Sequence, residues 1–93
     1  MTRPAPYRKL PISIEAMQWR PDDPETTGYL IGWLTANGAT HRCGWDSGGH
    51  TTLVLRTLEG DMTARPGDWI IRGVRGEFYP CAEDIFNETY EAT

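Results

Sequence analysis

Turn-forming residues divide the C-terminal third of the chain, Leu58–Tyr90, more closely than any other stretch. Glycine and proline mark three places there, Glu59–Gly60, Pro66–Gly67 and Gly73–Gly76. Proline fixes φ and glycine accepts positive φ, so each place is typical of a tight turn. Positive φ is expected at Gly67, Gly73 and Gly76. The short apolar runs between the turns predict strands rather than helices. The predicted strands are Asp61–Arg65, Asp68–Arg72 and Glu77–Pro80.

Three further strands are predicted before this stretch. In Pro11–Trp19 the side chains alternate between two faces, and the β-branched residues favour a strand over a helix. Ala39–Trp45 and Thr51–Leu58 are predicted as two further strands, which the glycine-containing segment Asp46–His50 joins as a hairpin. In the second of these strands, one face is expected to carry Leu53, Leu55 and Thr57.

Two helices complete the set of predicted elements. Asp23 and the two residues after it supply an N-cap acceptor, a proline at the first helical position and an acid near the positive end of the helix dipole. This helix is expected to run to about Asn37, where Gly38 provides a left-handed cap. A shorter helix is predicted over Cys81–Ala92. Its apolar stripe consists of Ile85, Phe86, Thr89 and Tyr90.

Together these elements predict an α+β fold: a small antiparallel sheet of about five or six short strands, a main helix after the first strand and a short C-terminal helix. A chain of 93 residues has room for one domain with one modest core. That domain is expected over residues 11–93. Residues 1–10 combine two prolines with three cations, which predicts a flexible N-terminal arm.

The main helix has two unequal sides. Its core face is predicted to consist of Tyr29, Leu30, Trp33 and Leu34. The opposite side holds Gly28, Gly32, Thr35 and Ala36, and no charged residue occurs from Thr26 to Thr40. Each helical glycine costs about 1 kcal/mol relative to alanine. Three explanations stay open: a contact with another protein chain, packing of the glycines on the domain's own sheet, or an exterior that is merely small and polar.

Charge and hydropathy exclude several classes of protein. The net charge of −4 argues against a general nucleic-acid binder, which needs a basic face. The chain lacks the run of about twenty apolar residues that a membrane span needs. Its N-terminal residues also lack the apolar core of an export signal. The expected location is therefore a reducing cytoplasm, where Cys43 and Cys81 are free thiols.

The soft metal ligands of the chain do not form a zinc pattern. His41 and Cys43 alternate on one predicted strand, but His50 and Cys81 are isolated, whereas a structural zinc site usually shows two close pairs. We therefore expect no metal and no cofactor. A disulfide between the two cysteines would need close Cα atoms and an oxidising compartment.

Nucleophilic catalysis at Cys81 is the strongest enzymatic alternative. A helix N-terminus lowers the pKa of a thiol, but the nearby acidic residues Glu83 and Asp84 oppose that effect. A histidine would also have to come close as a base. We expect a packed thiol and no enzyme activity.

A second alternative is a ligand pocket near the Pro66–Gly67 turn. Arginines and aromatic residues interleave in this stretch, and this combination can bind phosphates or stack bases. The candidate pocket residues are Arg65, Trp69, Arg72, Arg75 and Tyr79. Such a pocket would make the protein a small-molecule or nucleotide-binding module. The competing interpretation is a scaffold in which Trp69 is packed and the arginines are solvated.

About a third of the chain resembles a family of small bacteriophage and prophage proteins. The matching segments are Thr57–Ala64, Pro66–Ile71, Gly73–Val74, Gly76–Cys81, Asp84–Phe86 and Thr89–Glu91, which contain the sequences PGDW and GEFYPC. Ile12–Trp19 is similar to the first strand of that family, while Arg20–Gly49 has no counterpart. The family has no assigned chemistry, so the resemblance implies a phage origin and a compact fold.

Two functions from different classes follow. The first is a non-enzymatic phage accessory protein that binds and modulates a host bacterial protein in the host cytoplasm. Its contact surface would be the glycine-bearing side of the main helix, which could also support a homodimer. The second is the ligand-binding module described above. Neither requires nucleic acid or membrane insertion.

Overall fold

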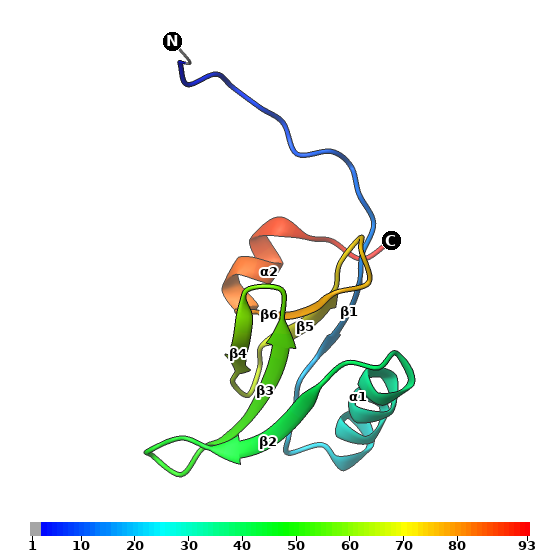
Figure 1. The fold of residues 1–93 in the computed structure, drawn as a ribbon, viewed down its shortest axis with the longest axis vertical. Coiled ribbons are helices and arrows are strands. Elements are labelled where there is room, and N and C mark those ends of the chain that lie inside the picture. The colour runs from blue at the N-terminus through cyan, green and yellow to red at the C-terminus, as the bar shows by residue number, and fades with distance from the viewer. Residues whose placement is uncertain (1–2) are drawn as a thin grey trace.

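The structure is a computed structural model that describes residues 3–93. It contains six strands and two helices, which confirms the predicted α+β class (Figure 1). The elements are β1 Glu15–Gln18, α1 Pro24–Ala36, β2 His41–Trp45, β3 Thr51–Thr57, β4 Gly60–Ala64, β5 Trp69–Arg72, β6 Phe78–Cys81 and α2 Glu83–Thr89. All were expected, most of them within a few residues of these bounds.

The strands form two antiparallel sheets, so the prediction of one sheet is wrong. Each sheet has three strands, ordered β1-β5-β6 in the first and β2-β3-β4 in the second. The second sheet is a simple meander of neighbouring strands. The first pairs β1 with β5, so that Met17 lies opposite Ile70 across the sheet. Alternation along the sequence shows where strands lie but not which distant strands pair.

The Pro66–Gly67 turn is the point where the chain passes from one sheet to the other. It is closed by a hydrogen bond from the Asp68 amide to the Arg65 carbonyl, at 2.9 Å. A hairpin here would have paired β4 with β5. Instead, the Gly67 amide donates to the Trp19 carbonyl and the Trp19 amide donates to the Asp68 carbonyl, each at 2.8 Å. These two bonds direct β5 to β1, which explains the division into two sheets.

One core joins both sheets to α1. It contains the buried residues Trp19, Leu30, Leu34, Leu53, Leu55, Ala64, Ile70 and Phe78. Leu53 and Leu55 are completely buried, so the predicted inward face of β3 is confirmed. Trp33 packs edge-on against Phe78, with ring centroids 5.0 Å apart. Helix α1 is thereby held against the sheet that β6 belongs to.

Both predicted caps of α1 are present. The carboxylate of Asp23 accepts hydrogen bonds from the amides of Glu25 and Thr26 and from the Thr26 hydroxyl. These bonds, that of the Thr26 hydroxyl foremost, lower the pKa of Asp23. At the other end Gly38 takes a φ of 70°. The amide of the next residue donates to the Leu34 carbonyl at 2.9 Å, as in a Schellman cap.

The orientation of α1 differs from the prediction at one residue. Leu30 and Leu34 are completely buried and Trp33 is partly buried, but Tyr29 is 67% exposed. Ile31 packs against the core instead. Because no lysine or arginine marks the outer side of this helix, the sequence fixes its rotation only loosely.

Several element ends also differ from the prediction, because partners limit their length. Strand β1 covers Glu15–Gln18 rather than Pro11–Trp19, since β5 offers only four residues for pairing. Helix α2 begins at Glu83 rather than Cys81, because Cys81 still pairs with Trp69 in the sheet. Its stripe is only partly inward: Phe86 is half-buried, while Ile85 is 52% exposed.

Two of the three expected positive φ angles are present. Gly67 and Gly76 have φ of 93° and 80°. Gly73 does not, and that expectation is wrong. Its amide instead bonds the Glu77 carbonyl at 2.7 Å, and a side chain at this position would meet the Glu77 carboxylate. A residue with a side chain at this position would force the Glu77 carboxylate to move and would come within 3.2 Å of the Tyr79 ring.

Residues 3–14, which include the described part of the predicted arm, contain neither helix nor strand. The arm leads away from the folded body and ends far from both sheets (Figure 1). Met1 and Thr2, which belong to the predicted arm of residues 1–10, lie outside the described residues. The arm reaches the body where Ile12 and Ile14 lead into β1.

Candidate interaction surfaces

The four residues proposed from the sequence as a contact surface lie together on the outside of α1. Gly28, Gly32, Thr35 and Ala36 are all exposed. We call them the glycine face. Leu30 and Leu34 point the opposite way, into the core. The explanation that the glycines pack on the domain's own sheet is therefore excluded.

The two glycines of this face meet no neighbouring group. A Cβ atom added to Gly28 or to Gly32 would have no atom within 4 Å outside the helix backbone. Neither glycine has positive φ. Packing and backbone geometry within the chain thus give no reason for glycine at either position. The cost of about 1 kcal/mol for each helical glycine is not offset inside the molecule.

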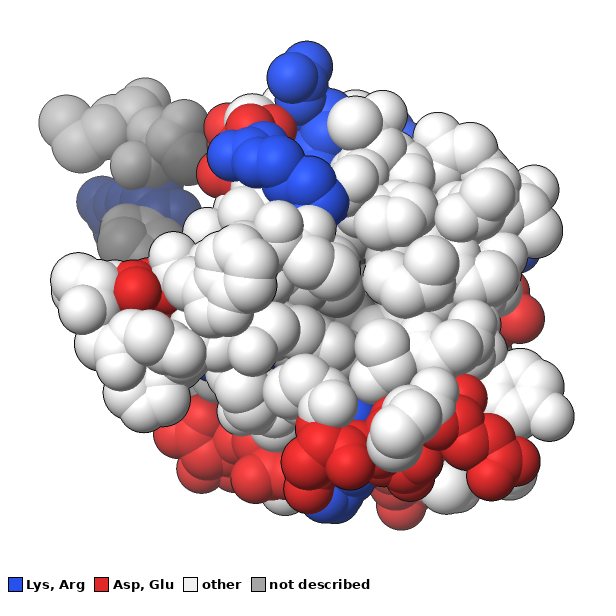
Figure 2. Space-filling model, turned by 90° about the horizontal axis from the view of Figure 1, so that it is seen from below, with Lys and Arg blue, Asp and Glu red and all other residues white. Residues whose placement is uncertain are grey.

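Tyr29 extends the glycine face, whereas helix periodicity predicts it on the core face. Its side chain is 67% exposed. One signal could have placed it correctly: Glu25 must lie in solvent at the helix start, and Tyr29 is four residues further along, on the same side. Figure 2, which views the molecule from below, shows a broad area without charged side chains, with acidic residues along one border.

The five residues of the alternative pocket do not surround one cavity. Trp69 and Ile71 are two positions apart on β5, so their side chains lie on the same face of the sheet. Tyr79 is paired with Ile71 across the sheet and therefore lies on that face as well. Arg72 lies on the other face and forms an ion pair of 3.2 Å with Glu15. Arg65 and Arg75 are exposed at two different turns. The geometry brings together the two aromatic residues but not the three arginines.

A groove lies between the two ends of the chain. It has a volume of about 600 Å³ and includes Trp69. The N-terminal wall consists of Lys9–Ile14, and the C-terminal wall contains Phe86 and Thr89–Thr93. We call this the terminal groove. Its aromatic side is ordered by stacking: Trp69 and Phe86 are nearly parallel with centroids 4.1 Å apart, and Tyr90 follows Phe86 at 5.0 Å.

The surroundings of the Cys81 thiol argue against a reactive thiol near the terminal groove. Burial raises the pKa of the Cys81 thiol, and Asp68 and Asp84 raise it further. Burial also raises the pKa of Tyr79 to about 12, with the neighbouring Tyr90 acting in the same direction. Cys81 is therefore protonated at neutral pH, which fits a packed thiol rather than a nucleophile.

The candidate metal ligands are not assembled into a site. Within residues 3–93, no group of three or more His, Cys, Asp or Glu side chains could hold a metal ion. The His41 ring contacts the Ala39 carbonyl at 2.8 Å, and His50 contacts Asp46 at 3.3 Å. Cys43 and Cys81 are both free thiols.

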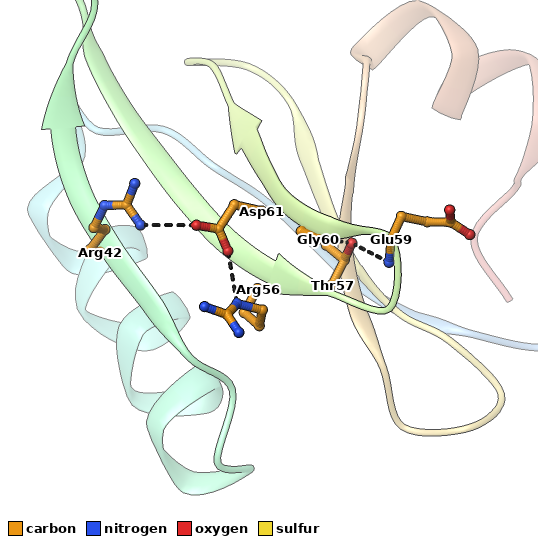
Figure 3. A network of polar contacts seen from close by, with 6 residues as sticks. All are labelled: Arg42, Arg56, Thr57, Glu59, Gly60 and Asp61. Carbon is orange, nitrogen blue, oxygen red and sulfur yellow. Dashed lines mark hydrogen bonds and ion pairs between the residues drawn. The ribbon is translucent and has the colours of Figure 1, made fainter.

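The outer face of the second sheet carries a small charged network. Asp61 on β4 bonds Arg56 on β3 at 2.9 Å and Arg42 on β2 at 3.3 Å (Figure 3). The hydrogen bonds from Arg56 and Arg42 lower the pKa of Asp61. The network crosses all three strands, and its residues are exposed. Its geometry fits a link between strands rather than a ligand site.

No family model, curated protein or solved structure matches this chain. The resemblance to the phage family thus stays an expectation drawn from the sequence. Neither helix in the described part of the chain is long and apolar enough to cross a bilayer.

Proposed function

We propose that this chain is a non-enzymatic phage accessory protein that binds a host bacterial protein through the glycine face of α1 and modulates or inhibits it. One observation carries the proposal: Gly28 and Gly32 are exposed, and nothing in the chain occupies the space beside them. Small residues four apart let a second backbone approach closely. The bacteriophage origin rests on the sequence resemblance.

The composition of the face indicates the kind of partner. It carries no charge, and Tyr29 projects beside it. Exposed tyrosines frequently anchor protein interfaces because they bury a large apolar ring and keep one hydroxyl for hydrogen bonding. A matching partner offers a flat, uncharged surface with a hollow for one ring. A charged ligand would find no opposite charge on this face.

The ligand-binding alternative has weaker support. A phosphate pocket needs its arginines around one cavity, whereas Arg72 lies on the far face from Trp69 and is paired with Glu15. The second cavity near Arg72 has a volume of about 310 Å³ and contains neither Trp69 nor Tyr79.

Gly32→Lys tests the proposal, because it places a long charged side chain in the middle of the glycine face. The open space around Gly32 means that the variant should fold. Leu58→Lys is the matched control, since Leu58 is 76% exposed at the distant β3–β4 turn and gains the same charge. Circular dichroism checks that both variants keep the fold.

The binding measurement has two stages. Host proteins retained by the wild type from a bacterial lysate are identified, and the purified candidate is then titrated calorimetrically. We expect Gly32→Lys to weaken binding at least about tenfold, and Leu58→Lys to bind like the wild type. Equal affinity of both variants would remove the glycine face from the interface and with it the proposed function.

A further inference from the structure

Charge is divided between the two ends of the chain. Residues 1–14 contain Arg3, Arg8 and Lys9 and no acidic residue. Residues 82–93 contain no basic residue and four acidic ones, which are Glu83, Asp84, Glu88 and Glu91. The two end segments are thus complementary in charge, although the chain as a whole has a net charge of −4.

The arm exposes apolar side chains as well as cations. Tyr7 is 94% exposed and Leu10 is 71% exposed. Lys9 is the point where the arm meets its own α2 region: its ammonium lies 3.4 Å from the Tyr90 hydroxyl and 4.7 Å from the centre of that ring. Beyond Lys9 the arm turns away from the body (Figure 1). Arg3 and Arg8 form no ion pair with any described carboxylate.

The C-terminal segment has no cationic partner for its carboxylates within the described residues, although Gln18 donates a hydrogen bond to Glu83, and part of its apolar surface is exposed. None of its four carboxylates forms an ion pair within residues 3–93. Helix α2 has no buried residue, and Ile85 is 52% exposed on it. The terminal groove runs beside this helix and is lined by Phe86, Tyr90 and Trp69. An acidic, partly apolar surface therefore adjoins an aromatic groove.

The other wall of the groove offers backbone groups. Lys9–Ile14 lines it, and sheet pairing begins only at Glu15. An extended segment lying in the groove can hydrogen-bond to this wall while its side chains enter the aromatic side. This is the way in which extended peptides commonly add to a free edge.

We propose that the N-terminal arm of one copy of this chain lies in the terminal groove of a second copy, with its arginines against the acidic residues of α2. Tyr7 supplies the apolar group for the aromatic wall. Exchange of the two arms is reciprocal, so it closes as a symmetric dimer and leaves no free arm. The arm's own groove is not its target, because the chain leaves that groove at Lys9 and turns outward.

A second copy is favoured over an unrelated partner because the chain carries both complementary parts. The arm has basic and apolar groups that are unpartnered within the described residues, and α2 with its groove has acidic and aromatic ones. The dimer would use a different surface from the glycine face, so the two proposals can fail separately.

Charge exchange between arm and helix tests the dimer. The arm variant is Arg3→Glu with Arg8→Glu, and the helix variant is Asp84→Lys with Glu88→Lys. Each variant alone brings like charges together in both contacts, so its dimer dissociation constant should rise at least about tenfold, as measured by sedimentation equilibrium at low salt. Mixed in equal amounts, the two variants restore opposite charges in both contacts, and dimerisation should return.

Controls separate this contact from general effects of charge. Arg65→Glu with Arg75→Glu makes the same change in net charge at two exposed turns that do not line the terminal groove, and its dimer should match that of the wild type. Gly32→Lys should also dimerise normally, because it alters only the glycine face. Circular dichroism of the helix variant checks that α2 still forms.

Three results would overturn the proposal. The first is a wild type that stays monomeric at low salt and high protein concentration. The second is a mixture of the two variants that fails to recover dimers although both variants are folded. The third is a dimer that Gly32→Lys abolishes and the arm variant leaves intact, which would make the glycine face the self-contact.

Discussion

Two glycines on α1 are placed where the monomer gains nothing from them. Gly28→Ala and Gly32→Ala should each stabilise the fold by about 0.5–1 kcal/mol, because alanine improves helix propensity and an added methyl group meets no atom within 4 Å. Urea unfolding of the single and double variants measures the gain. A loss of stability in either variant would contradict the open space beside these glycines and would mean that another group packs against the glycine face.

Gly73 provides the opposite case. A methyl group there meets the Glu77 carboxylate and comes within 3.2 Å of the Tyr79 ring. Gly73→Ala should therefore destabilise the fold by about 1–3 kcal/mol, as for other overpacked sites. Glu77→Ala in the same chain removes the first clash and should recover part of the loss. If the double variant is no more stable than Gly73→Ala alone, the cost comes from the Tyr79 contact or from the backbone.

Gly73, Gly67 and Tyr29 show how far residue types alone predict local structure. A glycine in the sequence can reflect either a positive φ or a close neighbouring side chain. At Gly73 the sequence alone does not distinguish these two causes. Gly67 was predicted correctly because a preceding proline specifies the turn. Tyr29 was misassigned because helix rotation depends on contacts with both sheets, which lie elsewhere in the sequence.

At the level of elements, local signals succeeded and pairing did not. Asp23 and Gly38 define both ends of α1 through bonds that span only a few residues. The pairing of β1 with β5 depends on bonds between Trp19 and the Pro66–Gly67 turn, nearly fifty positions apart in sequence. Similarly, the glycine face could be proposed from helix periodicity, whereas the terminal groove required knowing that both chain ends meet.

Helix α2 depends on an aromatic stack. Because it has no buried residue, the contacts of Phe86 with Trp69 and Tyr90 hold it to the sheet. Trp69→Ala should cost about 3 kcal/mol, the lower end for a large aromatic, since Trp69 is half-buried. Phe86→Ala should reduce helical circular dichroism while the six strands stay paired.

Ile85→Ala is the control for the stack, since Ile85 is on the same helix and 52% exposed. It should change stability by less than about 0.5 kcal/mol. A fully stable Trp69→Ala would instead place Trp69 among the solvent contacts and contradict its role as scaffold.

The charged network of the second sheet predicts a response to acid. Arg56 and Arg42 lower the pKa of Asp61 below its usual 3.8 in the folded state. The network therefore stabilises the fold fully above that value, and this stabilisation is lost as the pH falls through the lowered pKa. Asp61→Asn should be less stable at neutral pH and should decline less below about pH 4.

Urea midpoints at neutral and acid pH, at low and high salt, test this prediction. The difference between wild type and Asp61→Asn should shrink at high salt because the pairs are exposed. Asp22→Asn is the control, since Asp22 is outside the ion pairs of the described residues. Parallel acid curves for wild type and Asp61→Asn would contradict a stabilising role for the network.

For the molecule as a whole, we expect folding without metal. The four candidate ligands His41, Cys43, His50 and Cys81 do not assemble into a metal site within residues 3–93. A chelator should therefore leave the midpoint of thermal unfolding unchanged. A fall of several degrees would reveal a metal that contributes to the fold.

The two sheets should unfold together, because the main buried cluster draws its residues from both of them. Leu53, Leu55 and Ala64 come from the second sheet, Ile70 and Phe78 from the first, and Leu30 and Leu34 of α1 complete the same cluster.

Leu55→Ala opens a cavity in this shared core and should cost about 2–5 kcal/mol. If the core is cooperative, the loss will appear in hydrogen exchange of the β5 amides as strongly as in that of β3. Val54→Ala, next to Leu55 on the outer face, should affect both sheets much less. Unchanged protection of β5 in Leu55→Ala would mean that the first sheet is stable without the second, and residues 11–93 would then be two folding units rather than one domain.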